Sequence, residues 1–305
     1  MTQIYHPHLG KLEDYALLSV ASYFHNSAPS PLLQLFSHME FKQYPEMIEN
    51  HAGFSSSDLT RAKAIESCFC IPQFVLASKG GYGSIRSIES VRFKKDWEGI
   101  LCGFSDLTVL INYLATKTKV ACFHGPMFNY PKVWERDSFL YKSFEAFFCS
   151  KKFEYSDSFE GEFLQGSEIC GELFGGNLSV ICSMIGTPFE IDLKDKVLFI
   201  EEVNEASYKV DRMLMQLSLQ KGFSDLKGLI FGQFTDCSPR PLDCGDLEIY
   251  PMVQSYLKKW DFPVLWNAPI GHVKDFVIIP IGGESTWALG DNKQIEFQLS
   301  YPKNI

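Results

Sequence analysis

The sequence predicts an α/β protein of two domains. In the first half, short apolar stretches at 74–77, 99–102 and 119–123 alternate with segments of helical pattern. That alternation is typical of a parallel sheet with helices on its faces. The second half shows the same rhythm, with fully apolar strands predicted at 197–200 and 229–231 and a helical stripe between them. A chain of 305 residues is long enough for two domains or for one large domain.

The domain boundaries are predicted from a stretch without clear periodicity. Residues 130–165 are rich in Lys, Glu, Ser and aromatic residues, and we interpret them as the connection between the domains. The expected organisation is an N-terminal domain with a Rossmann-like parallel sheet at 1–140, a linking region at 141–168 and a C-terminal α/β domain at 169–305.

The first 50 residues are less informative. Residues 15–23 are apolar enough for a buried strand, and Pro29-Ser30-Pro31 marks a turn. The Ser-rich stretch 55–58 then indicates a helix start, and Pro72 ends that helix. Its apolar positions are Leu59, Ala62, Ala64, Ile65 and Cys68.

Composition and charge exclude several classes of protein. With 46% hydrophobic and 21% charged residues, the chain is an ordinary globular protein rather than a disordered one. A net charge of −9 argues against nucleic acid or an anionic membrane surface as the main partner. The N-terminal region combines no basic segment with an apolar core, and no apolar run approaches the roughly 18 residues of a membrane helix. We therefore expect a soluble, cytoplasmic protein.

The cysteines and the N-terminal histidines do not indicate a metal site. Nine cysteines without a Cys-x-x-Cys pair predict neither a zinc ribbon nor a thioredoxin-type site. We expect most of these cysteines to be buried, reduced thiols. His6 and His8 have no Cys or carboxylate partner nearby in the sequence, and we interpret them as incidental.

The segment 101–108 carries the first candidate catalytic residue. An apolar strand leads through a Gly and an aromatic residue to Ser105, and a helical pattern begins at once with Leu107. A strand that turns sharply into a helix places the Ser side chain at the carboxyl end of a sheet, beside a helix N-terminus. That position suits a nucleophile, because the following backbone N–H can help to hold an oxyanion. The alternative is that Ser105 or Asp106 only caps the helix.

A glycine-rich turn at 78–84 follows the apolar stretch 74–77. A dinucleotide fingerprint would need Gly-x-Gly-x-x-Gly with an acidic residue about 20 positions later, and a phosphate loop would end in Lys-Ser/Thr. This turn has neither pattern. Its three glycines in four positions, Gly80, Gly81 and Gly83, indicate close backbone approach or positive φ. Contact with a ligand and a plain structural turn are both open.

In the second half, two carboxylates and a histidine follow predicted strands. Glu201 and Glu202 stand at the carboxyl end of one strand, and His272 lies in a Gly-His turn after another. The alternatives are solvated carboxylates at a strand end and an ordinary surface histidine. A hydroxyl nucleophile needs a base, and an imidazole base needs a third group to orient it. The order Ser, Glu, His is also that of α/β-hydrolases, but the Gly-x-Ser-x-Gly elbow is not met, because the second residue after Ser105 is Leu.

Several separate blocks, in order, resemble the LD-carboxypeptidase family, which includes the microcin C immunity peptidases. The resemblance runs from about residue 53 to the end of the sequence. Any one block is a weak signal, but together they form a specific match. The blocks are Gly80-Gly81-Tyr82-Gly83, Gly103-Phe104-Ser105-Asp106-Leu107-Thr108, His124-Gly125-Pro126-Met127, Gly175-Gly176-Asn177-Leu178, Gly186-Thr187-Pro188, Phe199-Ile200-Glu201-Glu202, Tyr208-Lys209-Val210-Asp211-Arg212-Met213-Leu214 and Gly271-His272.

The family resemblance implies a serine peptidase with a Ser-His-Glu triad and with neither a metal nor a cofactor. Ser105 is then the nucleophile, His272 the general base and acid, and Glu201 the residue that orients His272. Relatives usually carry Asp at the position of Glu202, so the two neighbouring carboxylates are alternatives, of which we favour Glu201.

The resemblance also implies an oxyanion hole made of two backbone N–H groups. These are expected from Asp106 and from Gly81, with Gly80 or Tyr82 as alternatives for the second donor. Gly80, Tyr82 and Asn177 are the expected substrate-binding residues, although Asn177 also stands where it can cap a helix.

The implied reaction is the release of terminal D-Ala from a murein tetrapeptide during cell-wall recycling, in a cleft between the two domains. One alternative is a microcin C-type hydrolase that cleaves the bond between an acidic residue and a nucleotide analogue. Another is a ligand-binding relative without turnover. Lys79 and Lys209 replace common Arg residues and put the substrate pocket in question, because Lys lacks the planar fork of Arg. The expected partners are a small peptide and, by family resemblance, a second copy in a homodimer, with no nucleic acid and no membrane.

Overall fold

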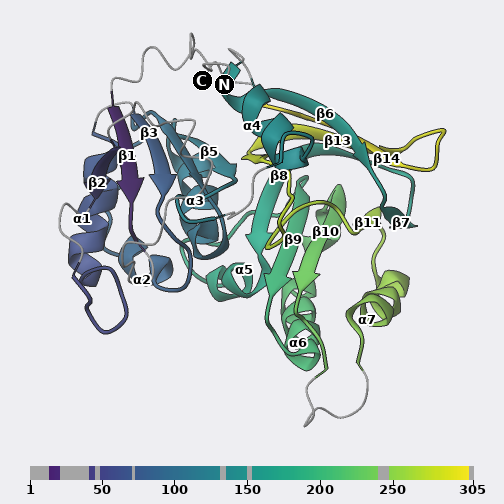
Figure 1. Cartoon of the computed structure of the whole chain (residues 1–305). Coiled ribbons are helices and arrows are strands. Elements are labelled where there is room, and N and C mark those ends of the chain that lie inside the picture. Colours follow the sequence, from purple (N-terminus) through teal and green to yellow (C-terminus); the bar gives the residue numbers. More distant parts are fainter. Residues whose placement is uncertain are drawn as a thin grey trace. The chain divides into compact units, whose positions relative to one another are not determined.

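The chain forms two compact units, and Figure 1 labels most of their helices and strands. The first unit comprises Met1–Glu154, Val277–Gly282 and Tyr301–Ile305, and the second comprises Tyr155–Phe276 and Gly283–Ser300. This computed structural model describes residues 14–20, 41–44, 49–70, 73–130, 135–149, 153–239 and 247–301. The predicted turn at 29–31 and the two N-terminal histidines lie outside the described residues.

The first unit is built on a six-stranded sheet with the order β12-β5-β4-β3-β1-β2. β1 to β5 pair in parallel, as the alternation of apolar and helical segments predicted. β12 instead runs antiparallel to β5, with Ile279 opposite His124. The strands are β1 (Asp14–Leu18), β2 (Phe41–Tyr44), β3 (Gln73–Ala77), β4 (Ile100–Gly103), β5 (Ala121–His124) and β12 (Ile279–Ile281).

Strand β12 makes the observed division of the chain differ from the predicted one. The prediction assigned all of 169–305 to the second domain, whereas 277–282 belong to the first unit. The physical reason is burial, because Ile279 and Ile281 are wholly buried where β12 covers the outer edge of β5. An uncovered edge would leave a row of backbone groups unpaired.

Helix α1 begins where the sequence predicted, and its buried face differs from the prediction. Ser57 is the N-cap, and its Oγ accepts a hydrogen bond from the Thr60 N–H at 3.2 Å. Leu59, predicted among the apolar positions, is 57% exposed, whereas Arg61 is wholly buried. α1 contacts β1 and β2 (Figure 1), and α3 contacts β4 and β5. The helices of this unit are α1 (Asp58–Cys68), α2 (Ser84–Ile88), α3 (Thr108–Lys117) and α4 (Phe139–Cys149).

The stretch expected to link the domains contains a helix and two strands instead. α4 lies in the first unit, where the ring of Phe147 packs edge-to-face on Phe123 at a centroid distance of 4.6 Å. β6 (Glu154–Phe159) and β7 (Glu162–Gln165) are the two edge strands of the second unit's sheet. The aromatic residues that obscured the period of this stretch therefore make packing contacts of the core.

The second unit is built on an eight-stranded mixed sheet with the order β6-β14-β13-β8-β9-β10-β11-β7. Its four central strands, β8 to β11, are parallel, and β13 and β7 flank them antiparallel on either side. α5 contacts β8, β9 and α6 (Figure 1). The remaining elements are β8 (Glu168–Asn177), β9 (Val197–Val203), β10 (Gly228–Thr235), β11 (Val264–Trp266), β13 (Gly283–Leu289), β14 (Ile295–Ser300), α5 (Leu178–Met184), α6 (Ser207–Ser218) and α7 (Ile249–Tyr256).

Buried aromatic side chains are prominent in the core of the second unit. Trp287 of β13 is wholly buried and stacks on Phe297 of β14, with the ring centroids 4.9 Å apart. The strand that carries the paired glutamates, β9, is buried from Val197 to Glu202. Within the described ranges, no helix has the length and apolar character that crossing a bilayer requires.

Candidate active site

Ser105 lies at a strained turn between a strand and a helix. It directly follows β4 and Phe104, and it opens the 3₁₀ turn Ser105–Leu107 that leads into α3. Its φ of +63° lies in the left-handed region, which few residues other than Gly adopt. This is the local geometry of a nucleophile elbow without the Gly-x-Ser-x-Gly sequence.

The alternative that Ser105 or Asp106 caps α3 is wrong. The N-cap position of α3 is Leu107, and no side chain makes a capping bond there. Asp106 is buried, and its Oδ2 accepts a hydrogen bond from the Ser84 N–H at 2.8 Å, at the start of α2. Burial raises the pKa of the Asp106 carboxyl above its usual range, and the hydrogen bonds from Ser84 and Gly83 oppose that shift.

The glycine turn after β3 lies directly against Ser105. A Cβ added to Gly80 would lie 2.9 Å from both the Cβ and the Oγ of Ser105, so this approach requires glycine. Gly81 and Gly83 have φ values of +111° and +127°, which L side chains rarely adopt. Tyr82 is 55% exposed, and its ring centroid lies 5.7 Å from that of Phe54. Within the first unit, the structure thus brings together Ser105 and the predicted turn.

Glu201 and His272 are paired within the second unit. Glu201 of β9 is wholly buried, and its Oε2 lies 2.7 Å from His272 Nδ1. Gly271 makes this contact possible, because a Cβ at that residue would lie 2.8 Å from Glu201 Oε2. A carboxylate at Nδ1 fixes the tautomer in which Nε2 accepts a proton. The pair therefore has the arrangement of a general base and the group that orients it.

Glu202 has a different task from its neighbour. Successive side chains of a strand point to opposite faces. The Glu202 carboxylate accepts hydrogen bonds from Asn177 Nδ2, the Ser179 N–H and the Val203 N–H at 2.8, 2.8 and 2.9 Å. Burial raises the pKa of Glu202, and these hydrogen bonds oppose the shift. The geometry thus pairs Glu201, and not Glu202, with His272.

Asn177 is held inside the fold by the same network. It is the N-cap of α5, where its Oδ1 accepts from the Val180 N–H at 3.2 Å and from Ser179 Oγ at 2.8 Å. It also sits opposite Glu201 in the register of β8 and β9. The capping bond predicted from the sequence is confirmed, whereas substrate contact by Asn177 stays a prediction.

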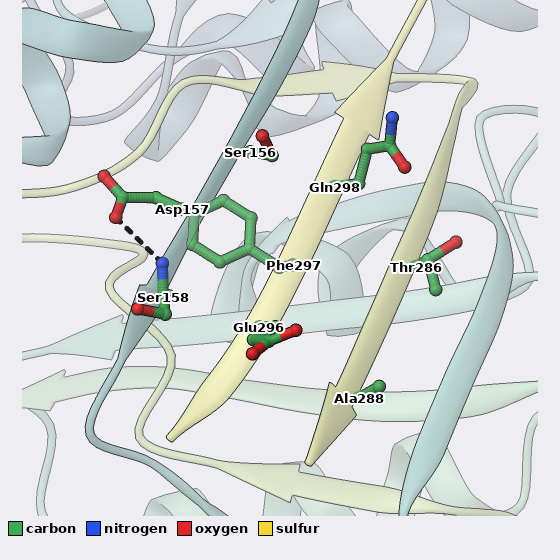
Figure 2. Close-up of a pocket in the computed structure, with 8 residues that line it drawn as sticks. All are labelled: Ser156, Asp157, Ser158, Thr286, Ala288, Glu296, Phe297 and Gln298. Carbon is green, nitrogen blue, oxygen red and sulfur yellow. Dashed lines mark hydrogen bonds between the residues drawn. The ribbon is translucent and has the colours of Figure 1, made fainter. Parts of the chain in front are cut away.

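The second unit also has a pocket of about 480 Å³ (Figure 2). Thr286 of β13 pairs with Cys170 of β8, whereas Asn177 at the other end of β8 pairs with Glu201. Along β8, the seven residue steps from Cys170 to Asn177 span about 23 Å. The pocket is lined by Ser156, Asp157, Ser158, Thr286, Ala288, Glu296, Phe297 and Gln298. Within the second unit, the pocket is therefore separate from the pairing of Glu201 with His272.

Cysteines and acidic residues give no metal centre in the part of the chain that the structure describes. There, no group of three or more His, Cys, Asp or Glu residues could hold a metal ion. Seven cysteines with described side chains are free thiols, of which Cys68, Cys102, Cys122 and Cys182 are buried and Cys70 and Cys170 are exposed. Burial raises the pKa of the Cys182 thiol to about 12.

Comparison with known proteins identifies the family. Residues 16–125 match the family model of the LD-carboxypeptidase N-terminal domain, and residues 170–286 match that of the LD-carboxypeptidase C-terminal domain. The probable murein peptide carboxypeptidase of Bacillus subtilis is 33% identical over an alignment of 216 residues, and the match covers 69% of this chain and 67% of the relative. The chain belongs to the LD-carboxypeptidase family. The resemblance stated from the sequence motifs is confirmed.

Solved structures share the fold of this chain. A muramoyltetrapeptide carboxypeptidase from Oxalobacter formigenes has a TM-score of 0.79 and 25% identity, and the match covers 95% of this chain and all of the other. An MccF-like protein from Bacillus anthracis has a TM-score of 0.77 and 22% identity, with 95% and 98% of the chains covered. The latter likeness concerns the fold alone.

Sequence reasoning missed the residues behind the glycine turn. Arg61 is buried in α1, donates to the Gly83 carbonyl at 3.0 Å and pairs with Asp58. The available signal was a charged residue within the otherwise apolar face of a predicted helix, because such a charge needs a buried partner.

Proposed function

We propose that this chain is a serine-type LD-carboxypeptidase that releases terminal D-Ala from a murein tetrapeptide. The observation that carries the proposal is the wholly buried Glu201 carboxylate 2.7 Å from His272 Nδ1. A second support is Ser105, held at φ +63° against Gly80. Together these residues supply a nucleophile, a base and an orienting group, the set that acyl transfer by a serine needs.

The proposed mechanism proceeds through an acyl-enzyme. Ser105 Oγ attacks the carbonyl of the diamino acid while His272 Nε2 accepts its proton, and Glu201 stabilises the imidazolium that forms. His272 then protonates the amine of the departing D-Ala and later activates the water that releases the product. The mechanism requires His272 Nε2 to reach Ser105 Oγ in the enzyme–substrate complex.

The oxyanion of each tetrahedral intermediate would be held by backbone N–H groups. We assign these to Asp106, the residue after the nucleophile, and to Gly81, with Gly80 or Tyr82 as alternatives for the second donor. The close approach of Gly80 to Ser105 supports a donor from this turn. Substrate contacts by Gly80, Tyr82 and Asn177 belong to the same proposal.

The choice of substrate is supported by relatives. The relative from Bacillus subtilis is named a probable murein peptide carboxypeptidase, and the solved structure from Oxalobacter formigenes is a muramoyltetrapeptide carboxypeptidase. A cytoplasmic location and a homodimer are further parts of the proposal. Of the two Lys residues that replace common Arg residues, Lys209 is paired, with Nζ 3.0 Å from Glu205 Oε2.

Mass spectrometry of the purified protein with L-Ala-γ-D-Glu-meso-diaminopimelate-D-Ala tests the proposal. We expect wild type to release D-Ala and Ser105→Ala to release it at least about 10³-fold more slowly. Ser90→Ala, at an exposed serine of the same unit, is the matched control and should match wild type. Equal release from Ser105→Ala would contradict the mechanism. Cleavage only of an aspartyl-nucleotide analogue would instead favour a microcin-type hydrolase, and cleavage of neither substrate a binding protein.

A further inference from the structure

The glycine turn 80–83 cannot fix its own position against Ser105. Three of its residues have no side chain, and the one side chain it carries, that of Tyr82, is 55% exposed. Yet Gly80 approaches Ser105 so closely that an added Cβ would lie 2.9 Å from Ser105 Oγ. Gly81 and Gly83 both have positive φ, a conformation that glycine does not enforce. The position of this backbone must therefore be set by groups outside the turn.

Arg61 of α1 reaches the turn from the core. Its side chain is wholly buried, and Nη1 donates to the Gly83 carbonyl at 3.0 Å. The same Nη1 donates to the carbonyl of Val20, just beyond β1, at 2.6 Å. Nη2 pairs with the Asp58 carboxylate, and the guanidinium carbon lies 4.6 Å from the centre of the Phe54 ring. One guanidinium thus ties the glycine turn to the end of β1 and to the start of α1.

The turn is held from a second side by the segment that carries the nucleophile. The Ser84 N–H donates to the Asp106 carboxylate at 2.8 Å, and Asp106 directly follows Ser105. Gly83 fits this arrangement, because a Cβ there would lie 2.5 Å from Arg61 Nη1. Two consecutive residues are therefore fixed, one by Arg61 and the next by the nucleophile segment.

We propose that Arg61 is a positioning residue that sets the glycine turn at the distance from Ser105 that acylation requires. The inference rests on the proposed function, in which an N–H of this turn holds the oxyanion. The planar guanidinium of Arg61 bonds the carbonyls of Val20 and Gly83 and the carboxylate of Asp58 at the same time. A Lys ammonium does not reproduce this arrangement. Because an oxyanion donor acts at short range in the transition state, a displaced turn lowers kcat and leaves substrate binding nearly unchanged.

Two variants of Arg61 and one control test the inference. Arg61→Lys keeps the charge beside Asp58 but loses the fork, and Arg61→Met removes both. The matched control is Ile65→Ala, because Ile65 is wholly buried one helical turn further along α1 and its loss destabilises the same helix. Where Arg61→Met fails to fold, Arg61→Lys decides.

The first measurement is amide hydrogen exchange of peptides covering residues 80–84, which needs no substrate. We expect the amides of this turn to exchange at least about tenfold faster in Arg61→Lys than in wild type. In Ile65→Ala, their exchange should rise by no more than the loss of global stability accounts for. Exchange in Arg61→Lys equal to that of wild type overturns the inference, whatever the substrate of the enzyme.

The second measurement separates kcat from KM for D-Ala release. We expect kcat of Arg61→Lys to fall roughly 10- to 100-fold with KM within about threefold of wild type, and Ile65→Ala to keep the wild-type kcat. An unchanged kcat in Arg61→Lys overturns the inference and leaves the proposed function standing. A wild type that releases no D-Ala overturns the proposed function, and the exchange measurement then still decides whether Arg61 holds the turn.

Discussion

Glu201 and Glu202 are adjacent buried carboxylates, and replacing each by Gln is expected to give opposite results. Glu201→Gln keeps the shape of the side chain but removes the charge 2.7 Å from His272 Nδ1. In the proposed mechanism this charge stabilises the imidazolium of the transition state. Amide replacement of a triad carboxylate lowers kcat by roughly 10³- to 10⁴-fold, or about 4–5.5 kcal/mol. We expect that loss here, with little change in Tm.

Glu202→Gln is expected to lower stability instead. The Glu202 carboxylate accepts three hydrogen bonds, from Asn177 Nδ2 and from the N–H groups of Ser179 and Val203. A Gln side chain has one acceptor oxygen, so its NH₂ group must face at least one of these donors. A buried donor without its partner costs about 2 kcal/mol, which corresponds to a fall in Tm of roughly 4–8 °C. We expect kcat to stay within about threefold of wild type.

The assay combines thermal unfolding, followed by circular dichroism, with the rate of D-Ala release by the same preparations. Both variants retain the volume of the buried side chain, so each serves as the control for the other. If folded Glu202→Gln loses as much kcat as Glu201→Gln, or if Glu201→Gln keeps the wild-type kcat, the pairing of Glu201 with His272 does not carry catalysis.

Two further predictions concern the first unit. Gly80→Ala places a Cβ 2.9 Å from Ser105 Oγ, so we expect a roughly 100-fold lower kcat with a small change in Tm, measured by D-Ala release and thermal unfolding. A wild-type kcat would show that the turn does not act on Ser105. Burial raises the pKa of Asp106 above its ordinary value of 3.8, so the folded state binds this proton more tightly. The resulting stabilisation is complete below that ordinary value and is lost as the pH rises through the raised pKa. As the pH rises from the ordinary pKa to the raised pKa, the Tm should therefore fall less in Asp106→Asn than in wild type. Parallel plots of Tm against pH for the two proteins would contradict a raised pKa of Asp106.

The local features of the fold were predictable because they depend on neighbouring residues. Apolar stretches followed by turn residues predicted the parallel strands β3, β4 and β5, and Ser57 marked the start of α1. The same reasoning placed Ser105 at a sharp turn from strand to helix, and its positive φ agrees with that placement. Periodicity and turn chemistry act over a few residues, so a single sequence is enough to detect them.

Features that depend on distant residues were not predictable in this way. β12 joins the sheet of the first unit because Ile279 and Ile281 cover the edge of β5, and no local pattern states which sheet an apolar strand completes. Arg61 is buried because Val20 and Gly83, distant in sequence, present carbonyls to it. The distinction between Glu201 and Glu202 likewise required the position of His272.

The central claim is that Ser105, His272 and Glu201 act as one catalytic unit, and the rate of the Ser105→Ala/His272→Ala double variant tests it most directly. Residues that act as a unit lose their effect together, so the double variant should release D-Ala no more slowly than Ser105→Ala alone. Losses that multiply, with the double variant slower than wild type by the product of the two single-variant effects, would show that the two residues act independently and would contradict the account.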